Sequence, residues 1–313
     1  MIASVKKALL GRDFLDIADL DAGELRQVLD LAHTIKKARR WPRRPLEGRH
    51  IAMLFQKPSH RTRVSFEVGI ARLGGNTTTL SEQDVQLGVR ETVGDAARVL
   101  DRYVDGVVAR LRSHADLLEL AAASARPVIN ALTNRSHPCQ VLADLVTLEE
   151  LKGDVSKQRV VYIGDGNNIV ASLIEASALA GFALTVITPP GYEPRADVVE
   201  RARSISTRKL QVTLTSDLAT LDDATAIYTD VWASMGHESE MEARRKAFAP
   251  YQVNQAVMQA APAAVFMHCL PAHRGEEVTD EVIDGPRSIV FDQAENRLYA
   301  QMALMTLLLG AGE

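Results

Sequence analysis

The sequence predicts an α/β protein built from two doubly wound parallel-sheet domains, with helices on both faces of each sheet. Short apolar segments alternate with amphipathic ones along the chain, a pattern typical of parallel sheets covered by helices. The length of 313 residues is enough for two domains of ordinary size. The hydrophobic content of 46% and the charged content of 24% are those of an ordinary globular protein.

The N-terminal half begins with a well-signalled helix. Asp21 and Glu24 have the spacing of a capping box. The apolar residues that follow lie on one helical face and are Leu25, Val28, Leu29, Ala32 and Ile35. The helix ends in "KKARRWPRRP", a basic stretch that a nucleic acid could bind. A solvated helix end, stabilised by the helix dipole, is the interpretation we favour.

The next elements follow the same alternation. A strand is predicted at 50–55, then a helix after "QKPSHRTR" with Phe66, Ile70 and Leu73 on one face and a stop at Gly74-Gly75. Further strands are predicted at 106–110 and 126–132, and a helix at 139–153. The second half is predicted to contain a helix at 168–180, a closing helix at 295–310, and strands at 160–164, 183–188, 226–231, 264–269 and 288–293.

The composition excludes several classes of protein. The net charge of −4 gives no whole-chain attraction to nucleic acid or to an anionic membrane. The only two cysteines, Cys139 and Cys269, exclude a disulfide framework and suit a reducing compartment. The N-terminal apolar run is short and makes a poor signal peptide, and no run approaches the roughly eighteen apolar residues of a membrane span. We therefore expect a cytoplasmic protein.

Ionisable and polar residues stand at the predicted strand ends, where open parallel sheets bind their ligands. In the first half they include Ser59, Arg61, Thr62, Arg110, His137 and Gln140, and in the second Asn168, Asp230, Ser234, Met235 and Cys269. In "KPSHRTR", a helix start offers backbone N–H groups beside two arginines and two hydroxyls. That combination indicates an anion site, and most of all a phosphate site. A capped helix with solvated arginines is the alternative.

Three other motifs are less specific. "GDGNN" follows a strand but lacks the third glycine of a dinucleotide fingerprint, so it is a tight turn or a pair of amides, Asn167 and Asn168, that bind a polar substrate. "HCLP" lacks zinc-ligand spacing, and a Cys-His hydrolase would require spatial evidence. Cys139 is interpreted as a small apolar filler near a helix start.

Taken in order, these motifs resemble the aspartate/ornithine transcarbamoylase family, and within it the ornithine carbamoyltransferases. The resemblance covers nearly the whole chain, through "FQKPSHRTRVSFEVGIARLGG", "HPCQVLADLVTLEE", "GDGNNIVASL", "DVWASMGHE", "HCLPAHRGEEVTDEV" and "FDQAENRLYAQMALM". It implies a carbamoyl phosphate-binding domain at 1–137, joined by a returning C-terminal helix at 295–313, and an ornithine-binding domain at 138–294. It also implies a homotrimer, or a multiple of trimers, with active sites at subunit interfaces.

The resemblance also implies roles for individual residues. The carbamoyl phosphate site would comprise Ser59, His60, Arg61, Thr62, Gln86, Arg110, His137, Gln140, Cys269, Leu270 and Arg297, with Gln86 reaching into a neighbouring subunit's site. The ornithine site would comprise Asn168, Asp230, Ser234 and Met235. Arg110, His137, Cys269 and Asp230 would be the catalytic group. His60 departs from the family, which usually has Thr or an apolar residue there. The Leu270–Pro271 bond is cis in relatives.

The implied reaction is attack of ornithine's side-chain amine on the carbamoyl carbon, which gives citrulline and phosphate in arginine metabolism. Cys269 would orient the amine and would not act as a covalent nucleophile. No metal or organic cofactor follows from the sequence. The alternatives are a transcarbamoylase for putrescine, acylated ornithine or aspartate, a non-catalytic binding subunit of the same fold, and a dinucleotide oxidoreductase. Whether the pathway is biosynthetic or degradative stays open.

Overall fold

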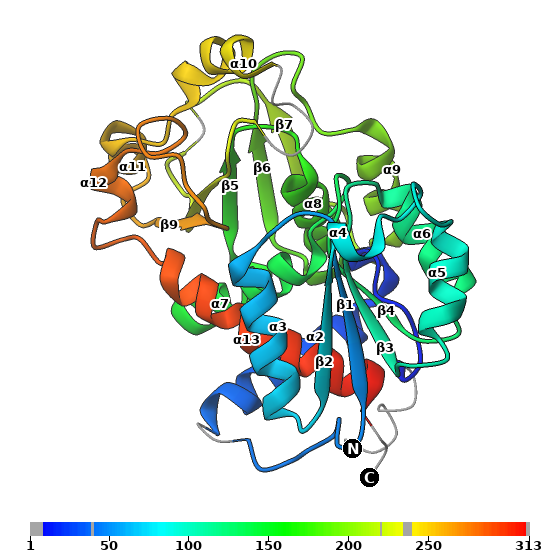
Figure 1. The fold of residues 1–313 in the computed structure, drawn as a ribbon. Coiled ribbons are helices and arrows are strands. Elements are labelled where there is room, and N and C mark those ends of the chain that lie inside the picture. The colour runs from blue at the N-terminus through cyan, green and yellow to red at the C-terminus, as the bar shows by residue number, and fades with distance from the viewer. Residues whose placement is uncertain (1–8, 39–40, 220, 234–239, 311–313) are drawn as a thin grey trace. The chain divides into compact units, whose positions relative to one another are not determined.

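The structure is a computed structural model that describes residues 9–38, 41–219, 221–233 and 240–310. The chain forms two compact units, one of residues 1–146 with 297–313 and one of residues 147–296 (Figure 1). Each unit is built around one parallel β-sheet with helices, so the predicted fold class is confirmed. Two helices contribute to both units, α7 (Pro138–Lys152) and α13 (Val290–Leu309).

The N-terminal unit contains a four-stranded sheet in the order β2-β1-β3-β4. Its strands are β1 (His50–Phe55), β2 (Asn76–Ser81), β3 (Gly106–Arg110) and β4 (Val128–Leu132). Its helices are α2 (Ala22–Lys37), α3 (His60–Arg72), α4 (Glu82–Val85), α5 (Val93–Leu100) and α6 (His114–Ala123), with a 3₁₀ turn, η1, at Ile17–Asp19. All strand pairs are parallel, and Phe55 of β1 is level with Arg110 of β3.

The predicted helix signals of this unit are confirmed. Asp21 accepts a hydrogen bond from the Glu24 amide at 2.7 Å, and the Glu24 carboxylate accepts one from the Asp21 amide at 2.9 Å. The five apolar residues predicted on one face of α2 are all buried. Ser59 caps α3, and Gly74, with φ of +90°, follows its end. A side chain at Gly74 would be strained in that left-handed conformation.

Both faces of this sheet are covered by helices. On one face, residues of β1, β3 and β4 pack in a single apolar cluster with α5 and α6. Figure 1 shows α2, α3 and α13 on the other face. There Gly69 of α3 leaves room for Met302 and Met305 of α13, since a Cβ on Gly69 would lie 3.3 Å from each. The C-terminal helix therefore packs on the N-terminal unit.

The C-terminal unit contains a five-stranded parallel sheet in the order β7-β6-β5-β8-β9. Its strands are β5 (Arg159–Ile163), β6 (Ala183–Ile187), β7 (Val212–Thr215), β8 (Ala226–Thr229) and β9 (Val265–His268). Its helices are α8 (Asn168–Ala180), α9 (Ala196–Ile205), α10 (Met241–Phe248), α11 (Gln255–Ala260) and α12 (Asp280–Ile283), with 3₁₀ turns η2 (Val155–Lys157) and η4 (Ala249–Tyr251). One apolar cluster joins the sheet to α11 and α12, and Figure 1 shows α8 and α9 on the other side of the strands.

One strand prediction is wrong. Residues 288–293 were expected to form a strand, but α13 begins at Val290 and only Ser288 makes an isolated bridge, to Phe266. Val290 and Gln293 are buried, whereas Phe291 is 70% exposed, which is the spacing of a helix with one buried face. The run is short and apolar, which is typical of a strand. No turn residue marks the point where α13 begins, so its first turn was read as a separate element.

Two strands were not predicted. β2 and β7 stand at sheet edges, are rich in threonine, and keep several side chains exposed. They lack the apolar runs that identified the buried strands, because an edge strand packs less of its surface. Helices α5, α6, α9, α10 and α11 were also not predicted from the sequence.

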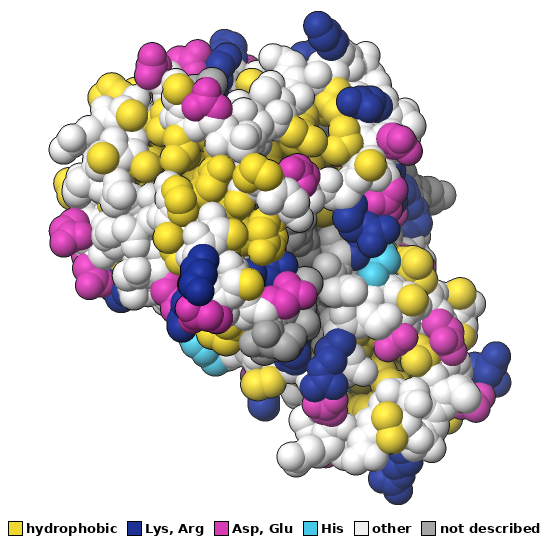
Figure 2. All heavy atoms as spheres, turned by 90° about the horizontal axis from the view of Figure 1, so that it is seen from above, with side chains coloured by type: hydrophobic (Ala, Val, Ile, Leu, Met, Phe, Trp, Pro, Cys, Tyr) yellow, Lys and Arg dark blue, Asp and Glu magenta, His cyan; other side chains and the backbone are white. Residues whose placement is uncertain are grey.

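The surface carries mixed charge. On the face shown in Figure 2, acidic and basic side chains lie among apolar and neutral ones, and neither sign covers a continuous area. Such a face has no strong attraction for a polyanion. In the basic stretch after α2, the described Arg43 lies over the ring of Trp41, with 5.9 Å to the ring centre. Within the described ranges, no helix is both long and apolar enough to cross a membrane.

Candidate functional site

Each sheet has a point where the strand order reverses, and open α/β sheets bind ligands at such points. In the N-terminal unit, chain connections diverge between β1 and β3, and in the C-terminal unit between β5 and β8. β1 leads into Ser59–Thr62 and β3 ends at Arg110. β5 leads into "GDGNN", β8 leads into Asp230, and β9 leads into Cys269. Ser59–Thr62, Arg110, "GDGNN" and Asp230 therefore follow the strands beside the two switch points, and Cys269 follows the neighbouring strand β9.

The first turn of α3 brings two hydroxyl groups together in the N-terminal unit. The Ser59 hydroxyl oxygen accepts from the Thr62 amide at 3.4 Å and donates to the Thr62 hydroxyl at 3.1 Å. His60 and Arg61 are the first residues of the helix, where backbone N–H groups have no acceptor within the helix. The positive end of the helix dipole and the adjacent arginine together favour a phosphate-like anion.

Arg297 of α13 is fixed inside this unit. Its Nη1 donates to Gln140 Oε1 at 2.8 Å, and its Nη2 lies 3.5 Å from the Thr62 hydroxyl. Gln140 in turn donates from Nε2 to Asp144 Oδ1 at 2.9 Å. All four side chains are buried, so the guanidinium is held in one orientation. Residues from α3, α7 and α13, far apart in sequence, therefore form one polar network.

His137 lies at the start of α7 beside this network. Burial lowers the pKa of its imidazole well below the ordinary value, and the positive charges of Arg297, Arg110 and Arg61 lower it further. The ring is therefore neutral at physiological pH and can donate one hydrogen bond without adding charge. Arg61, Arg110 and Arg297 are therefore all near enough to His137 to act on its charge.

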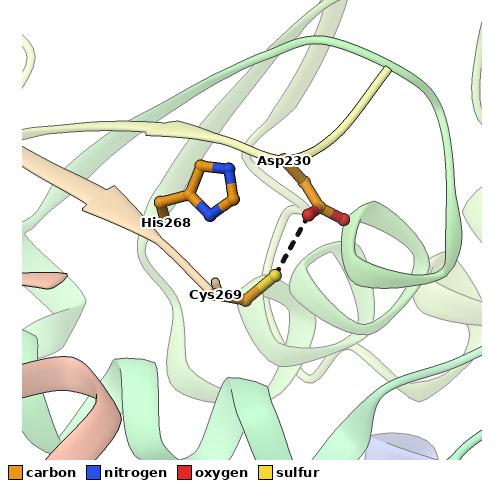
Figure 3. A group of neighbouring side chains, drawn as sticks. All are labelled: Asp230, His268 and Cys269. Atoms are coloured by element: carbon orange, nitrogen blue, oxygen red, sulfur yellow. Dashed lines mark hydrogen bonds between the residues drawn. The ribbon is translucent and has the colours of Figure 1, made fainter. Parts of the chain in front are cut away.

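The C-terminal unit brings Cys269 and Asp230 together (Figure 3), and Asn167 is hydrogen-bonded to the same carboxylate. The Cys269 thiol donates to Asp230 Oδ1 at 3.1 Å, and Asn167 Nδ2 donates to Asp230 Oδ2 at 2.8 Å. Asn167 also caps α8 through its side-chain oxygen. Asp230 is 8% exposed, so its carboxylate is held by two donors at the edge of the solvent. A buried carboxylate of this kind attracts a cation such as an ammonium group.

His268, next to Cys269, has a structural role. Its Nδ1 accepts from the Leu270 amide at 2.8 Å, so the proton is on Nε2, which donates to Glu277 at 3.0 Å. Asp230, His268 and Cys269 lie close enough to hold a metal ion. Because both ring nitrogens of His268 are engaged within the protein, it has no lone pair left for a metal ion. The Leu270–Pro271 bond is cis, and Leu270 has a φ of +57°.

The remaining predicted residues are placed as follows. His60 and Gln86 are exposed, and Gln86 ends α4 in a left-handed conformation with φ of +44°. Asn168 is the first residue of α8. Ser234 and Met235 lie outside the described residues. Cys139 is fully buried, donates to the Asn130 carbonyl at 3.3 Å, and has a pKa raised to about 12 by burial, which agrees with its interpretation as a filler.

Near Asp230, the sequence did not point to Glu277 or Tyr162, and it suggested a different role for Asn167. Asn167 was considered with Asn168 as a substrate ligand, but its amide is used by α8 and by Asp230. Glu277 lies nine residues after His268, and its link to the imidazole required the loop to fold back. Tyr162 is fully buried in β5, and burial and the Asp230 charge raise the pKa of its phenol well above the ordinary value. Neither Glu277 nor Tyr162 has a motif of its own.

Comparisons with known proteins show which family the chain resembles. Residues 12–150 match the family description "Aspartate/ornithine carbamoyltransferase, carbamoyl-P binding domain", and residues 156–308 match its "Asp/Orn binding domain". A protein of Thermococcus kodakarensis named ornithine carbamoyltransferase is 51% identical, over 97% of this chain and 98% of its own length. A protein of Pyrococcus furiosus named "Ornithine carbamoyltransferase, anabolic" is 50% identical over 97% of this chain and 98% of its own length.

Solved structures are equally similar. The structure titled as ornithine carbamoyltransferase from Pyrococcus furiosus has a TM-score of 0.91 and 50% identity, and covers 96% of this chain and 98% of its own. The structure from Thermus thermophilus has a TM-score of 0.86 and 43% identity, with coverage of 95% and 98%. The likeness therefore extends over both units.

Proposed function

Since the chain belongs to the aspartate/ornithine carbamoyltransferase family, we propose that it transfers the carbamoyl group of carbamoyl phosphate to the side-chain amine of L-ornithine. The products are L-citrulline and phosphate. The observation that carries the choice of ornithine is the full-length similarity to proteins named ornithine carbamoyltransferase. One of these is named anabolic, which supports a place in arginine biosynthesis.

The N-terminal unit supplies the groups that carbamoyl phosphate requires. Ser59, His60, Arg61 and Thr62 hold the phosphate at the start of α3. Arg110, His137 and Thr62 contact the carbamoyl oxygen, where negative charge develops as the tetrahedral intermediate forms. Gln140 binds the carbamoyl nitrogen, and Arg297 reinforces the site through its bond to Gln140. The lowered pKa of His137 supports a neutral donor at this position.

The C-terminal unit supplies the groups that ornithine requires. A free alkyl amine has a pKa of about 10.4, so its nucleophilic form is scarce at neutral pH. Asp230 attracts the ammonium form, and a site closed to water favours loss of its proton. The thiol of Cys269 is hydrogen-bonded to Asp230 and orients the nitrogen. Asn168, Ser234 and Met235 complete the proposed ornithine contacts, with Leu270 at the closing loop. The departing phosphate accepts the proton.

We also propose how the domains are divided, how the subunits assemble and in which compartment the enzyme works. Residues 1–137 with 295–313 form the carbamoyl phosphate domain, and residues 138–294 form the ornithine domain. The enzyme is a trimer or a multiple of trimers, in which Gln86 reaches a neighbouring site. Both cysteines are free thiols, which suits a reducing compartment such as the cytoplasm.

A ureido-product assay tests the proposal. The purified protein is incubated with carbamoyl phosphate and, in separate reactions, with ornithine, putrescine, acetylornithine and aspartate. We expect product with ornithine and only background with the other three. Product with another acceptor would replace ornithine in the proposal, and no product with any acceptor would favour a non-catalytic binding protein.

A further inference from the structure

Arg244 of α10 is a buried arginine outside all the motifs considered so far. It is 5% exposed, and its Nη1 lies 3.0 Å from Asp165 Oδ2. The same Nη1 donates to the Trp232 carbonyl at 2.8 Å, and Nε donates to Glu240 at 3.1 Å. The guanidinium also lies over the ring of Tyr192, 5.0 Å from its centre. So many partners fix the position of the group tightly.

Two of these partners belong to segments that hold Asp230. Asp165 lies in the turn between β5 and α8, and two residues later Asn167 donates to Asp230 Oδ2 at 2.8 Å. Trp232 follows Asp230 by two residues at the end of β8. The guanidinium thus joins the segment that carries Asp230 to the turn that carries its hydrogen-bond donor.

We propose that Arg244 is a positioning residue for Asp230 and, through it, for Cys269. Arg244 touches neither substrate. It fixes the distance between the β5–α8 turn and the segment after β8, so that the Asp230 carboxylate receives Asn167 on one oxygen and Cys269 on the other. The consequence for ornithine rests on the function proposed above.

The β5–α8 turn is closely packed, so a change at Arg244 should shift the position of the turn. The Gly166 amide donates to the Tyr192 carbonyl at 2.9 Å, and a Cβ on Gly166 would lie 2.4 Å from the Pro194 nitrogen. Tyr192 also packs edge-to-face on Phe248, with 4.7 Å between ring centres, and Trp232 stacks on Phe248. Arg244 lies among these rings and supplies the positive charge that the buried Asp165 carboxylate needs.

Lysine cannot replace this arginine. A single ammonium keeps the charge but lacks the planar fork that reaches Asp165, Glu240 and the Trp232 carbonyl together. The variant Arg244→Lys therefore keeps a buried positive charge but loses some of the hydrogen bonds that join the β5–α8 turn to the segment after β8. We expect the KM for ornithine to rise about tenfold, and the KM for carbamoyl phosphate to stay within about twofold.

Arg287→Lys is the matched control. Arg287 follows β9 in the chain, and its side chain also donates to backbone carbonyls of the C-terminal unit, those of Met258, Ala261 and Pro262. Its main-chain carbonyl accepts from the Phe266 amide of β9, and the substitution keeps that bond. We expect this variant to keep both KM values. Thermal unfolding of both variants compares their stability. A general loss of folded protein lowers kcat without separating the two KM values.

A second readout does not depend on activity. Cys139 is fully buried with a raised pKa, so iodoacetamide reacts at Cys269, as peptide mapping would verify. The thiol is held against Asp230 Oδ1 by its hydrogen bond at 3.1 Å, which restricts its approach to a reagent. Displacing that carboxylate in Arg244→Lys should increase the alkylation rate at least about threefold, with no change in Arg287→Lys.

The two readouts separate the two proposals. Wild-type protein that makes no citrulline would defeat the proposed function, and the alkylation rate alone would then decide the role of Arg244. If the wild-type protein is active, an unchanged KM for ornithine in Arg244→Lys would overturn the positioning role. An alkylation rate equal to that of the wild type would overturn it in either case.

Discussion

The imidazole of His137 is buried, and the charges of three arginines act on it, so its environment determines how it responds to pH. Burial and the charges of Arg297, Arg110 and Arg61 lower its pKa in the folded protein well below the ordinary value near 6.5. In the unfolded chain the imidazole has its ordinary pKa. Below that pKa the unfolded state binds one more proton than the folded state, so acid favours unfolding.

The first prediction concerns this linkage. The stability contributed by a neutral His137 is fully present above its unfolded pKa and is lost as pH falls toward its folded pKa. Between about pH 7.5 and about pH 5.5, wild-type protein should lose about 1 kcal/mol more stability than His137→Gln, which has no imidazole to titrate. Urea unfolding of both proteins at the two pH values measures the difference. Equal losses would show that His137 titrates alike in both states.

The second prediction concerns Arg110 at the end of β3. Removing one donor to an oxyanion costs about 2.7–4 kcal/mol of barrier, or about a hundredfold to a thousandfold in turnover. Arg110→Ala should lose this much kcat and stay folded. Arg112→Ala is the control, since Arg112 is exposed and pairs with Glu82. Near-normal turnover of Arg110→Ala in the citrulline assay would remove Arg110 from the proposed oxyanion site.

For individual residues, the sequence indicates the candidates but not the hydrogen bonds between them. Asp230 and Cys269 were placed near one another because both follow strands of one parallel sheet. The bond of Asn167 to Asp230, the link of His268 to Glu277 and the position of Arg244 depend on loops that return to the site. Loop conformation has no periodic signal in a sequence, so these contacts required the structure.

Among the elements, α2 illustrates what local sequence determines. Its capping box and apolar face are both local patterns, and both were predicted correctly. The start of α13 is the contrary case, because Ile289 and Val290 are compatible with either a strand or a helix. Only the packing of the following turns decides between the two. The edge strands β2 and β7 were missed because they keep several side chains exposed and so lack the apolar runs that identify buried strands.

The third prediction concerns the cap of α2. Asp21→Ala removes the acceptor for the Glu24 amide and should destabilise the protein by about 1 kcal/mol, a common cost for a lost N-cap. Asp30→Ala on the same helix is the control, because its exposed pair with Arg26 contributes little. Urea unfolding measures both variants. A loss in Asp30→Ala as large as that in Asp21→Ala would contradict the capping interpretation.

For the whole molecule, the notable feature is that each unit carries its own polar cluster at its own switch point. The N-terminal unit gathers cationic and neutral donors, and the C-terminal unit gathers a carboxylate and a thiol. This division follows from the residues that come after each strand along the chain, and it could be predicted from the sequence. The assembly of several chains could not be derived from composition or periodicity, and the trimer rests on the family resemblance.

Gln86 is the residue through which assembly can be tested. It is exposed and holds a left-handed backbone conformation, φ +44° and ψ +50°, which costs a non-glycine residue about 1 kcal/mol or more. Its carbonyl accepts from the amides of Val89 and Arg90, which keep the turn in place. A strained, exposed residue of this kind suits a side chain that acts on a neighbouring molecule.

The last prediction uses two inactive variants that restore activity when mixed. If each site combines Arg110 of one subunit with Gln86 of its neighbour, trimers of Arg110→Ala alone or Gln86→Ala alone contain no intact site. In a trimer reassembled at random from equal amounts, a site is intact when its own subunit has Arg110 and its neighbour has Gln86. Each condition holds for about half of the subunits, so about a quarter of wild-type activity should return. The variants are mixed under conditions that dissociate and reform the trimer, and citrulline is then measured. Activity no higher than the average of the two separate variants would place Gln86 in the site of its own subunit.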